Sequence, residues 1–153
     1  MAKLLRPLRS QDDGQLLLLI LVYALIAAVL VGIVVDTSRA FLHRRSLAAA
    51  ADAAASSGAN AIDVEEFYAR AGAGERLPLD AAHVETAVQT YVTDAGLTGR
   101  FEALTAASST DGETVTVTLT ARVSLPFDVL SLAPGGAPVE VTASARAPYL
   151  PQF

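Results

Sequence analysis

Few side chains in this sequence could carry out chemistry, and they lie far apart. The chain has no Cys and only two His, His43 and His83, which are 40 residues apart. A disulfide scaffold, a zinc finger, an iron–sulfur site and thiol chemistry are therefore excluded. The sequence also contains no Gly-x-Ser-x-Gly nucleophile motif and no calcium-binding loop. We expect no catalytic residue, no cofactor and no metal site, and hence no enzymatic activity.

A glycine-rich stretch at residues 71–78 and the carboxylates remain as candidates for binding. A phosphate-binding loop needs a strand before it and a helix directly behind it, and residues 71–78 have neither, so we expect an ordinary loop. Residues 51–153 carry 13 Asp and Glu against five Arg, whereas residues 1–50 carry six Lys and Arg against three Asp. The acidic body argues against nucleic acid as a partner, and we expect its carboxylates to be solvated.

Three charged residues have positions that suggest a specific contact. Asp36 and Arg39 are three residues apart, so on a helix their side chains can meet. Alternatively, each side chain extends separately into the lipid headgroups. Asp52 is the one charged residue among the seven alanines of residues 48–55. Its side chain is either exposed, which we favour, or paired with an arginine of a neighbouring helix that the small alanines allow to approach.

These residues lie on or next to a long apolar segment near the N-terminus. Residues 16–35 contain no charge, and about 20 helical residues span the ~30 Å hydrocarbon layer of a bilayer. A chain of this size would not bury a helix that is apolar on every side. A cleaved signal peptide usually has a shorter apolar region of ~7–15 residues with a small-residue cleavage site close behind it. Asp36 and three arginines follow instead, so we predict an uncleaved anchor in the lipid bilayer.

The helix is expected to continue beyond the membrane, because residues 36–57 contain no Pro or Gly. We place its end at Ser56-Ser57-Gly58, with Gly58 as a left-handed cap. Its apolar residues form a stripe whose partner is either the protein's own body or the helices of other subunits. The stripe consists of two adjacent rows at seven-residue intervals: Ile33, Ala40, Leu47 and Ala54, and Val34, Phe41, Ala48 and Ala55.

The remaining residues predict a small α+β domain. A short helix is expected from Asp63, and a longer one from Asp80, which caps it, to Gly96. Residues 113–123 and 139–147 alternate apolar and polar residues, residues 101–107 form a weaker third strand, and residues 109–112 form a hairpin turn. The expected fold is an amphipathic helix packed on a three-stranded antiparallel sheet with one wet face. Inward positions are expected to be Val84, Val88, Tyr91, Val92 and Ala95 on the helix, and Val115, Val117, Leu119, Ala121, Val123, Val139, Val141, Ala143 and Ala145 on the strands.

The N-terminal segment resembles the TadE/TadG-like proteins of the tight-adherence (Tad/Flp) pilus assembly system, of the actinobacterial type. In that family a Gly-Gln opens the membrane span, an Asp closes it, and an Ala-Ala-Asp-Ala-Ala block follows on the same helix. The body resembles them more loosely, at residues 77–80, 114–119 and 125–126. The residues that carry the resemblance, and that it implies as an assembly motif, are Gly14, Gln15, Asp36, Arg39, Phe41, Leu47, Ala51 and Asp52.

The resemblance implies a single-pass protein of the plasma membrane that acts as a minor pilin-like or pseudopilin-like component of TadG type. Its implied partners are other pilus-assembly or secretion subunits, which would contact residues 36–55. Basic residues flank the span equally, three on each side, so the orientation follows from the resemblance and the short tail. We expect a cytoplasmic tail at residues 1–14, a transmembrane and extended helix at 15–58, and an extracytoplasmic domain at 59–153.

The sequence departs from the family pattern in two ways. Pilin-like members carry Glu at the fifth position after the Gly, where this chain has Leu19. We therefore expect no cleavage after Gly14. The chain also has no room for the added adhesive or metal-binding domain of large TadG-type members. The alternative function is that of a membrane-tethered binding module of an envelope or secretion complex that does not enter a filament.

Overall fold

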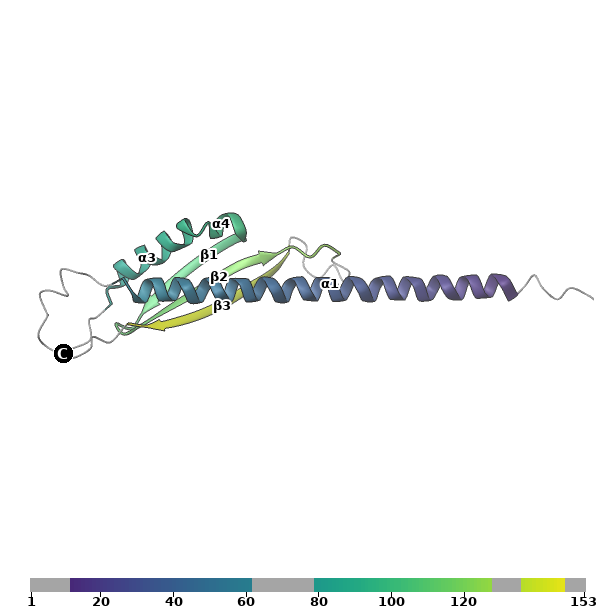
Figure 1. Ribbon diagram of the computed structural model, residues 1–153, viewed down its shortest axis with the longest axis horizontal. Coiled ribbons are helices and arrows are strands. Elements are labelled where there is room, and N and C mark those ends of the chain that lie inside the picture. The colour runs from purple at the N-terminus through teal and green to yellow at the C-terminus, as the bar shows by residue number, and fades with distance from the viewer. Residues whose placement is uncertain (1–11, 62–78, 128–135, 148–153) are drawn as a thin grey trace, which may run out of the picture.

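The computed structural model describes residues 12–61, 79–127 and 136–147. The helix expected from Asp63, the loop at residues 71–78 and most of the connection before the last strand lie outside these ranges. The described part has the predicted α+β fold, with a long N-terminal helix followed by a small helix-and-sheet body (Figure 1). Its elements are α1 (Asp12–Ala59), α3 (Ala81–Asp94), α4 (Leu97–Arg100), β1 (Glu102–Thr110), β2 (Thr114–Val123) and β3 (Ala137–Arg146).

Helix α1 is one continuous rod. It has 48 residues, which at 1.5 Å rise per residue corresponds to about 72 Å. Its C-terminal half lies along the sheet, whereas its N-terminal half extends alone beyond the body (Figure 1). The same helix therefore forms both the apolar extension and part of the core.

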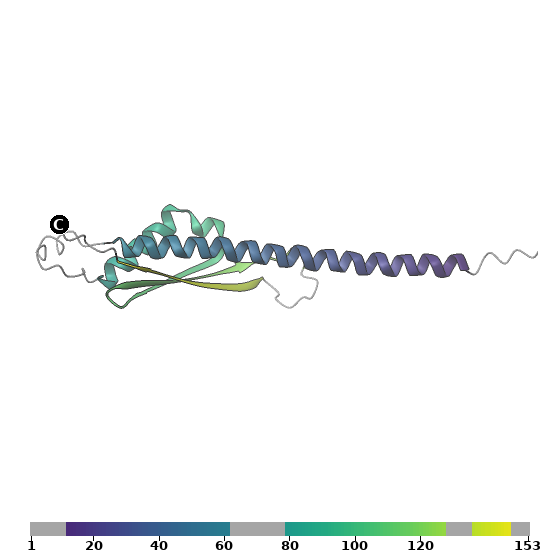
Figure 2. The same cartoon turned by 60° about the horizontal axis from the view of Figure 1, so that its bottom comes forward.

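The sheet is antiparallel with the order β1-β2-β3. The predicted alternation is confirmed most clearly in the central strand β2, whose five inward residues are at most 3% exposed. Both helices, α1 and α3, lie on one face of the sheet (Figure 2). The opposite face carries the threonines of β2, as expected for a sheet with one wet side.

A tight turn joins β1 to β2. The carboxylate atom Oδ1 of Asp111 accepts hydrogen bonds from the backbone N–H groups of Glu113, at 2.9 Å, and Thr114, at 2.7 Å. These bonds favour the ionised form and lower the pKa of Asp111. The hairpin was predicted, but β1 extends through Thr110, so the turn begins later than the expected residues 109–112.

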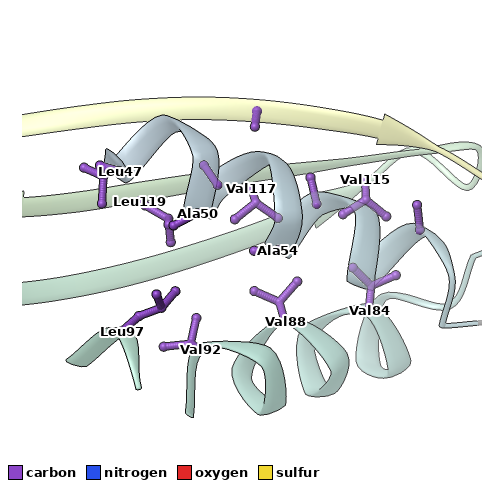
Figure 3. Packing of buried hydrophobic residues seen from close by; sticks show 14 of the residues in the cluster. Leu47, Ala50, Ala54, Val84, Val88, Val92, Leu97, Val115, Val117 and Leu119 are labelled. Atoms are coloured by element: carbon purple, nitrogen blue, oxygen red, sulfur yellow. The ribbon is translucent and has the colours of Figure 1, made fainter. Parts of the chain in front are cut away.

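Small side chains of α1 allow it to pack closely against β2 and β3, while α3 packs against α1 and β1. The core is an aliphatic layer between these helices and the sheet (Figure 3). The most buried residues of α1 are Leu47, Ala51, Ala54 and Ala55, each 0% exposed, and those of β2 include Val115, Val117 and Leu119.

Helix α3 begins as predicted. Asp80 is its N-cap and accepts a hydrogen bond from the backbone N–H of His83 at 3.2 Å. The three valines of the predicted face are buried and Tyr91 is half-buried. Ala95 was predicted to face inward, but it is exposed. The reason is that α3 ends at Asp94 and the backbone reverses at Gly96, which has a φ of 60°.

The predicted role of Gly58 as a left-handed cap was wrong. Gly58 is helical and buried, and α1 continues through Ala59. A Cβ atom at Gly58 would lie 3.1 Å from Val115 Cγ1, 3.2 Å from Val88 Cγ2 and 3.3 Å from Val84 Cγ1. Glycine is therefore required here by the close approach of α1, α3 and β2 rather than by a backbone conformation.

Candidate functional site

The N-terminal half of α1 presents an uncovered apolar surface. Its large apolar side chains from Leu16 to Val35 are 36–71% exposed. The most apolar 18-residue stretch of the helix has a mean hydropathy of 3.2, and 6% of that stretch is buried. Because this segment is largely exposed, it is not a core helix of the body. In the ranges described above it is the one helix long and apolar enough to cross a membrane, which indicates single-pass anchoring.

Asp36 connects the end of this apolar segment to the body. Its side chain is 8% exposed, and its Oδ1 accepts a hydrogen bond from the backbone N–H of Phe127 at 3.2 Å. Arg39 is exposed, and the described residues contain no ion pair between it and Asp36. The structure therefore shows no pairing of the two residues, and Asp36 is buried against the body rather than extended toward headgroups. Asp36 contacts a backbone group 91 residues away instead of a neighbour on its own helix.

The apolar stripe beyond the membrane segment packs on the protein's own body. Leu47 and Ala51, two residues of the implied assembly motif, are fully buried against the sheet and α3. Phe41 was assigned to the same stripe but is 64% exposed. The buried positions follow helical spacing, at residues 47, 50, 51, 54, 55, 58 and 59. Residues spaced seven apart rotate by about 20° per repeat around a straight α-helix. The row that starts at Phe41 therefore does not stay on the buried face, and Phe41 lies outside it.

The opposite face of the same helical segment is open. Asp52 and Arg45 are exposed there, which agrees with the favoured expectation for Asp52 within a single chain. Phe41 contributes a large apolar side chain to this open surface. An exposed carboxylate among alanines, together with a nearby arginine, is a surface that another helix can approach closely.

Gly14 and Gln15 lie at the other end of α1 and are exposed. No atom outside the helix backbone lies within 4 Å of a Cβ placed at Gly14. The structure thus separates the eight motif residues into three places: the start of the apolar segment, its junction with the body at Asp36, and the region from Arg39 to Asp52.

A polar cluster near this junction was not predicted. The ring of His43 packs edge-on against Phe101, with centroids 5.1 Å apart and an interplanar angle of 89°. Arg100 lies over the same Phe101 ring at 5.6 Å and donates from Nη2 to Ser46 Oγ at 2.9 Å. His43 Nε2 is buried and has no hydrogen-bond partner among the described residues, which costs ~1–3 kcal/mol.

Sequence reasoning treated His43 as an ordinary residue near the membrane. Its only local signal is the three-residue spacing from Ser46, which places both on one helical face. Arg100 comes 54 residues after Ser46, and no spacing rule connects them. His83, the other histidine, forms a local pair with Asp80, with Nδ1 and Oδ2 2.9 Å apart. In the described ranges, no group of three or more potential metal ligands is present.

Comparison with known proteins relates the N-terminal part of the chain to a family. Residues 14–61 match a family model described as putative Flp pilus-assembly TadE/G-like. Neither the curated proteins nor the solved structures provided a match to the chain. The matched range begins at Gly14 and includes the apolar segment, Asp36 and the alanine-rich stretch around Asp52. It covers α1 and not the sheet. Residues 14–61 are therefore similar to the TadE/G-like Flp pilus-assembly family.

Proposed function

We propose that the protein is a membrane-anchored structural component of Flp pilus assembly, minor pilin-like or pseudopilin-like and of TadG type, without enzymatic activity. The observation that carries this proposal is the continuity of α1. One helix of 48 residues exposes apolar side chains along its first half and forms part of the body's core with its second half. An anchor built in this way fixes the position of the body relative to the membrane.

The junction makes this coupling stiff. The hydrogen bond between Asp36 and Phe127 holds the segment after β2 against α1 immediately after the apolar segment. From Leu47 onward the helix is buried against the sheet. A displacement of the anchor is therefore transmitted to the sheet through a continuous helix, which is a property suited to subunits that assemble side by side.

The open face of α1 is the proposed contact with neighbouring subunits. Asp52 and Arg45 are exposed there, and an ion pair between two chains would be partly shielded by surrounding alanines. The charge-swap test is Asp52→Arg, which should reduce assembly, combined with Arg45→Asp, which should restore it. Failure of every such swap would leave Asp52 as a solvated side chain.

We propose that the body is extracytoplasmic and the N-terminal tail cytoplasmic. The chain has no Cys, so single cysteines can be introduced without background. Ser109→Cys lies at an exposed position of β1 and should react with a membrane-impermeant thiol reagent in intact cells. Ser10→Cys should react only after the membrane is permeabilised. The reverse labelling pattern would overturn this orientation.

The assembly role is tested by isolating the tagged full-length protein from detergent-solubilised membranes of the native host. We expect other Flp pilus-assembly subunits to co-purify. A second experiment tests whether the membrane helix itself makes specific contacts. A variant replaces three exposed leucines of α1, Leu17, Leu21 and Leu25, by Ile, which preserves hydropathy but alters the shape of the side chains. Retention in the membrane with reduced co-purification would indicate specific helix contacts. Isolation of the wild-type protein without any pilus-assembly subunit would contradict the proposal.

A further inference from the structure

A cavity of about 600 Å³ lies between α1, α4 and the adjoining ends of β1 and β2. Its volume falls within the ~300–1,000 Å³ typical of small-ligand pockets. Its lining contains three arginines from three different elements, Arg39 of α1, Arg100 of α4 and Arg122 of β2, and one carboxylate, Glu102. The pocket thus has an excess of two positive charges, with the His43 ring in its wall.

This positive charge stands out against the rest of the body. Residues 51–153 carry 13 acidic residues and five arginines, and two of those five, Arg100 and Arg122, line this one pocket. Arg39 and Arg100 are exposed and belong to the helices that flank the pocket. Arg122 instead alternates with the threonines on the opposite face of β2. Such a concentration of guanidinium groups attracts an anion, and planar guanidinium groups match the oxygens of phosphate in particular.

The backbone beside the pocket is irregular in a way that sets the position of its carboxylate. The β1–β2 register shifts between Glu102 and Thr105, and Ala103 has a φ of 50°. This left-handed conformation is costly for alanine. Beyond the shift, Glu102 lies opposite Arg122 in the strand pairing. The carboxylate is thereby placed near one arginine and leaves the positive charge of the other two in excess.

The pocket lies at the height of lipid headgroups if α1 crosses the membrane. The apolar segment ends at Val35, and Arg39 follows four residues later, which corresponds to about 6 Å along the helix. His43 lies about 12 Å beyond Val35 by the same measure. Headgroup layers extend roughly 5–8 Å beyond the hydrocarbon on each side. The end of the pocket that is nearest the membrane, at Arg39, therefore lies in the headgroup layer.

We propose that this pocket binds the phosphate group of an anionic phospholipid. Arg39 reaches the phosphate from the membrane side, and Arg100 binds it from the body. The bound lipid links the anchor to the sheet at their junction. This proposal rests on α1 crossing the membrane but not on the role in pilus assembly, so the two can fail separately.

The test measures lipid binding to the purified full-length protein in neutral detergent by microscale thermophoresis. The probes are short-chain phosphatidylglycerol, the matched phosphatidylcholine and inorganic phosphate. We expect phosphatidylglycerol to bind at least ~10-fold more tightly than either of the others, since a charge-assisted contact to phosphate is worth roughly a factor of ten or more. Equal binding of the two lipids, or binding of inorganic phosphate as tight as that of phosphatidylglycerol, would overturn the proposal.

The pocket itself is tested with Arg100→Gln and, independently, Arg39→Gln, each expected to weaken phosphatidylglycerol binding roughly ten-fold. Arg146→Gln is the matched control, because it removes the same charge from an exposed position of β3 outside the pocket. It should leave the dissociation constant unchanged. Circular dichroism verifies that each variant is folded. If both pocket variants bind as the wild type does, or if Arg146→Gln weakens binding equally, the proposal is wrong.

Discussion

The substitution Gly58→Ala tests the close packing of α1, α3 and β2 directly. Replacing Gly by Ala inside a helix normally stabilises it by ~1 kcal/mol. At Gly58 the new methyl group would meet Val115, Val88 and Val84 at 3.1–3.3 Å. These valines are at most 1% exposed, and their branched side chains have few alternative rotamers. An overpacked core methyl costs ~1–3 kcal/mol, so we expect a net destabilisation of about 1 kcal/mol.

The control is Gly99→Ala in α4, where a Cβ meets nothing within 4 Å and the φ is not positive. Here the helix preference acts without the clash, so stability should be unchanged or slightly increased. The assay is thermal unfolding of the full-length protein in neutral detergent, monitored by the far-ultraviolet circular dichroism of the sheet. A loss of about 1 kcal/mol lowers the Tm of a domain this size by roughly 4–8 °C. The reasoning is refuted if Gly58→Ala raises the Tm as much as Gly99→Ala does.

Three further predictions concern single residues. Asp36→Ala should leave membrane insertion intact. It should speed hydrogen–deuterium exchange of the backbone amide of Phe127 by roughly ten-fold, because this N–H loses its acceptor. An unchanged exchange rate would show that the hydrogen bond does not hold Phe127 against α1. The backbone hydrogen bonds of Asp111 lower its pKa below the ordinary value of 3.8. The ionised carboxylate therefore stabilises the fold above pH 3.8, and this contribution is lost as the pH falls through the lowered folded-state pKa. An NMR titration of the turn amides should show this loss, and an Asp111→Asn variant should lack it. Intact-mass analysis of membrane-extracted protein should show no cleavage after Gly14, and a species starting at the following residue would contradict this.

The fold was predictable because its signals are local. Alternation in residues 114–123 specifies which side of β2 is buried, and the charge-free stretch after Gln15 specifies an exposed apolar helix. The packing role of Gly58 was not predictable, because it depends on valines from two other elements. The sequence allowed a cap at that position, and only the arrangement of three elements excludes it.

The candidate site was predictable only where its signals are local in the sequence. The family motif identified Asp36 and Asp52 as positions of interest, but their surroundings differ: Asp36 is buried and Asp52 exposed. The partner of Asp36 comes 91 residues later in the chain. The pocket assembles arginines from a helix, a one-turn helix and a strand, and α4 itself, with four residues, carries no periodic signal.

The measurement that tests the central claim most directly is crosslinking in intact cells at Asp52→Cys. This position is exposed on the proposed contact face of α1, and Ser144→Cys is an exposed control on β3. If the protein is an assembly component, Asp52→Cys should form crosslinks to a second copy or to another pilus-assembly subunit, and Ser144→Cys should form few. The absence of crosslinks at Asp52→Cys, or equal crosslinking at both positions, would contradict this account and favour a tethered monomer.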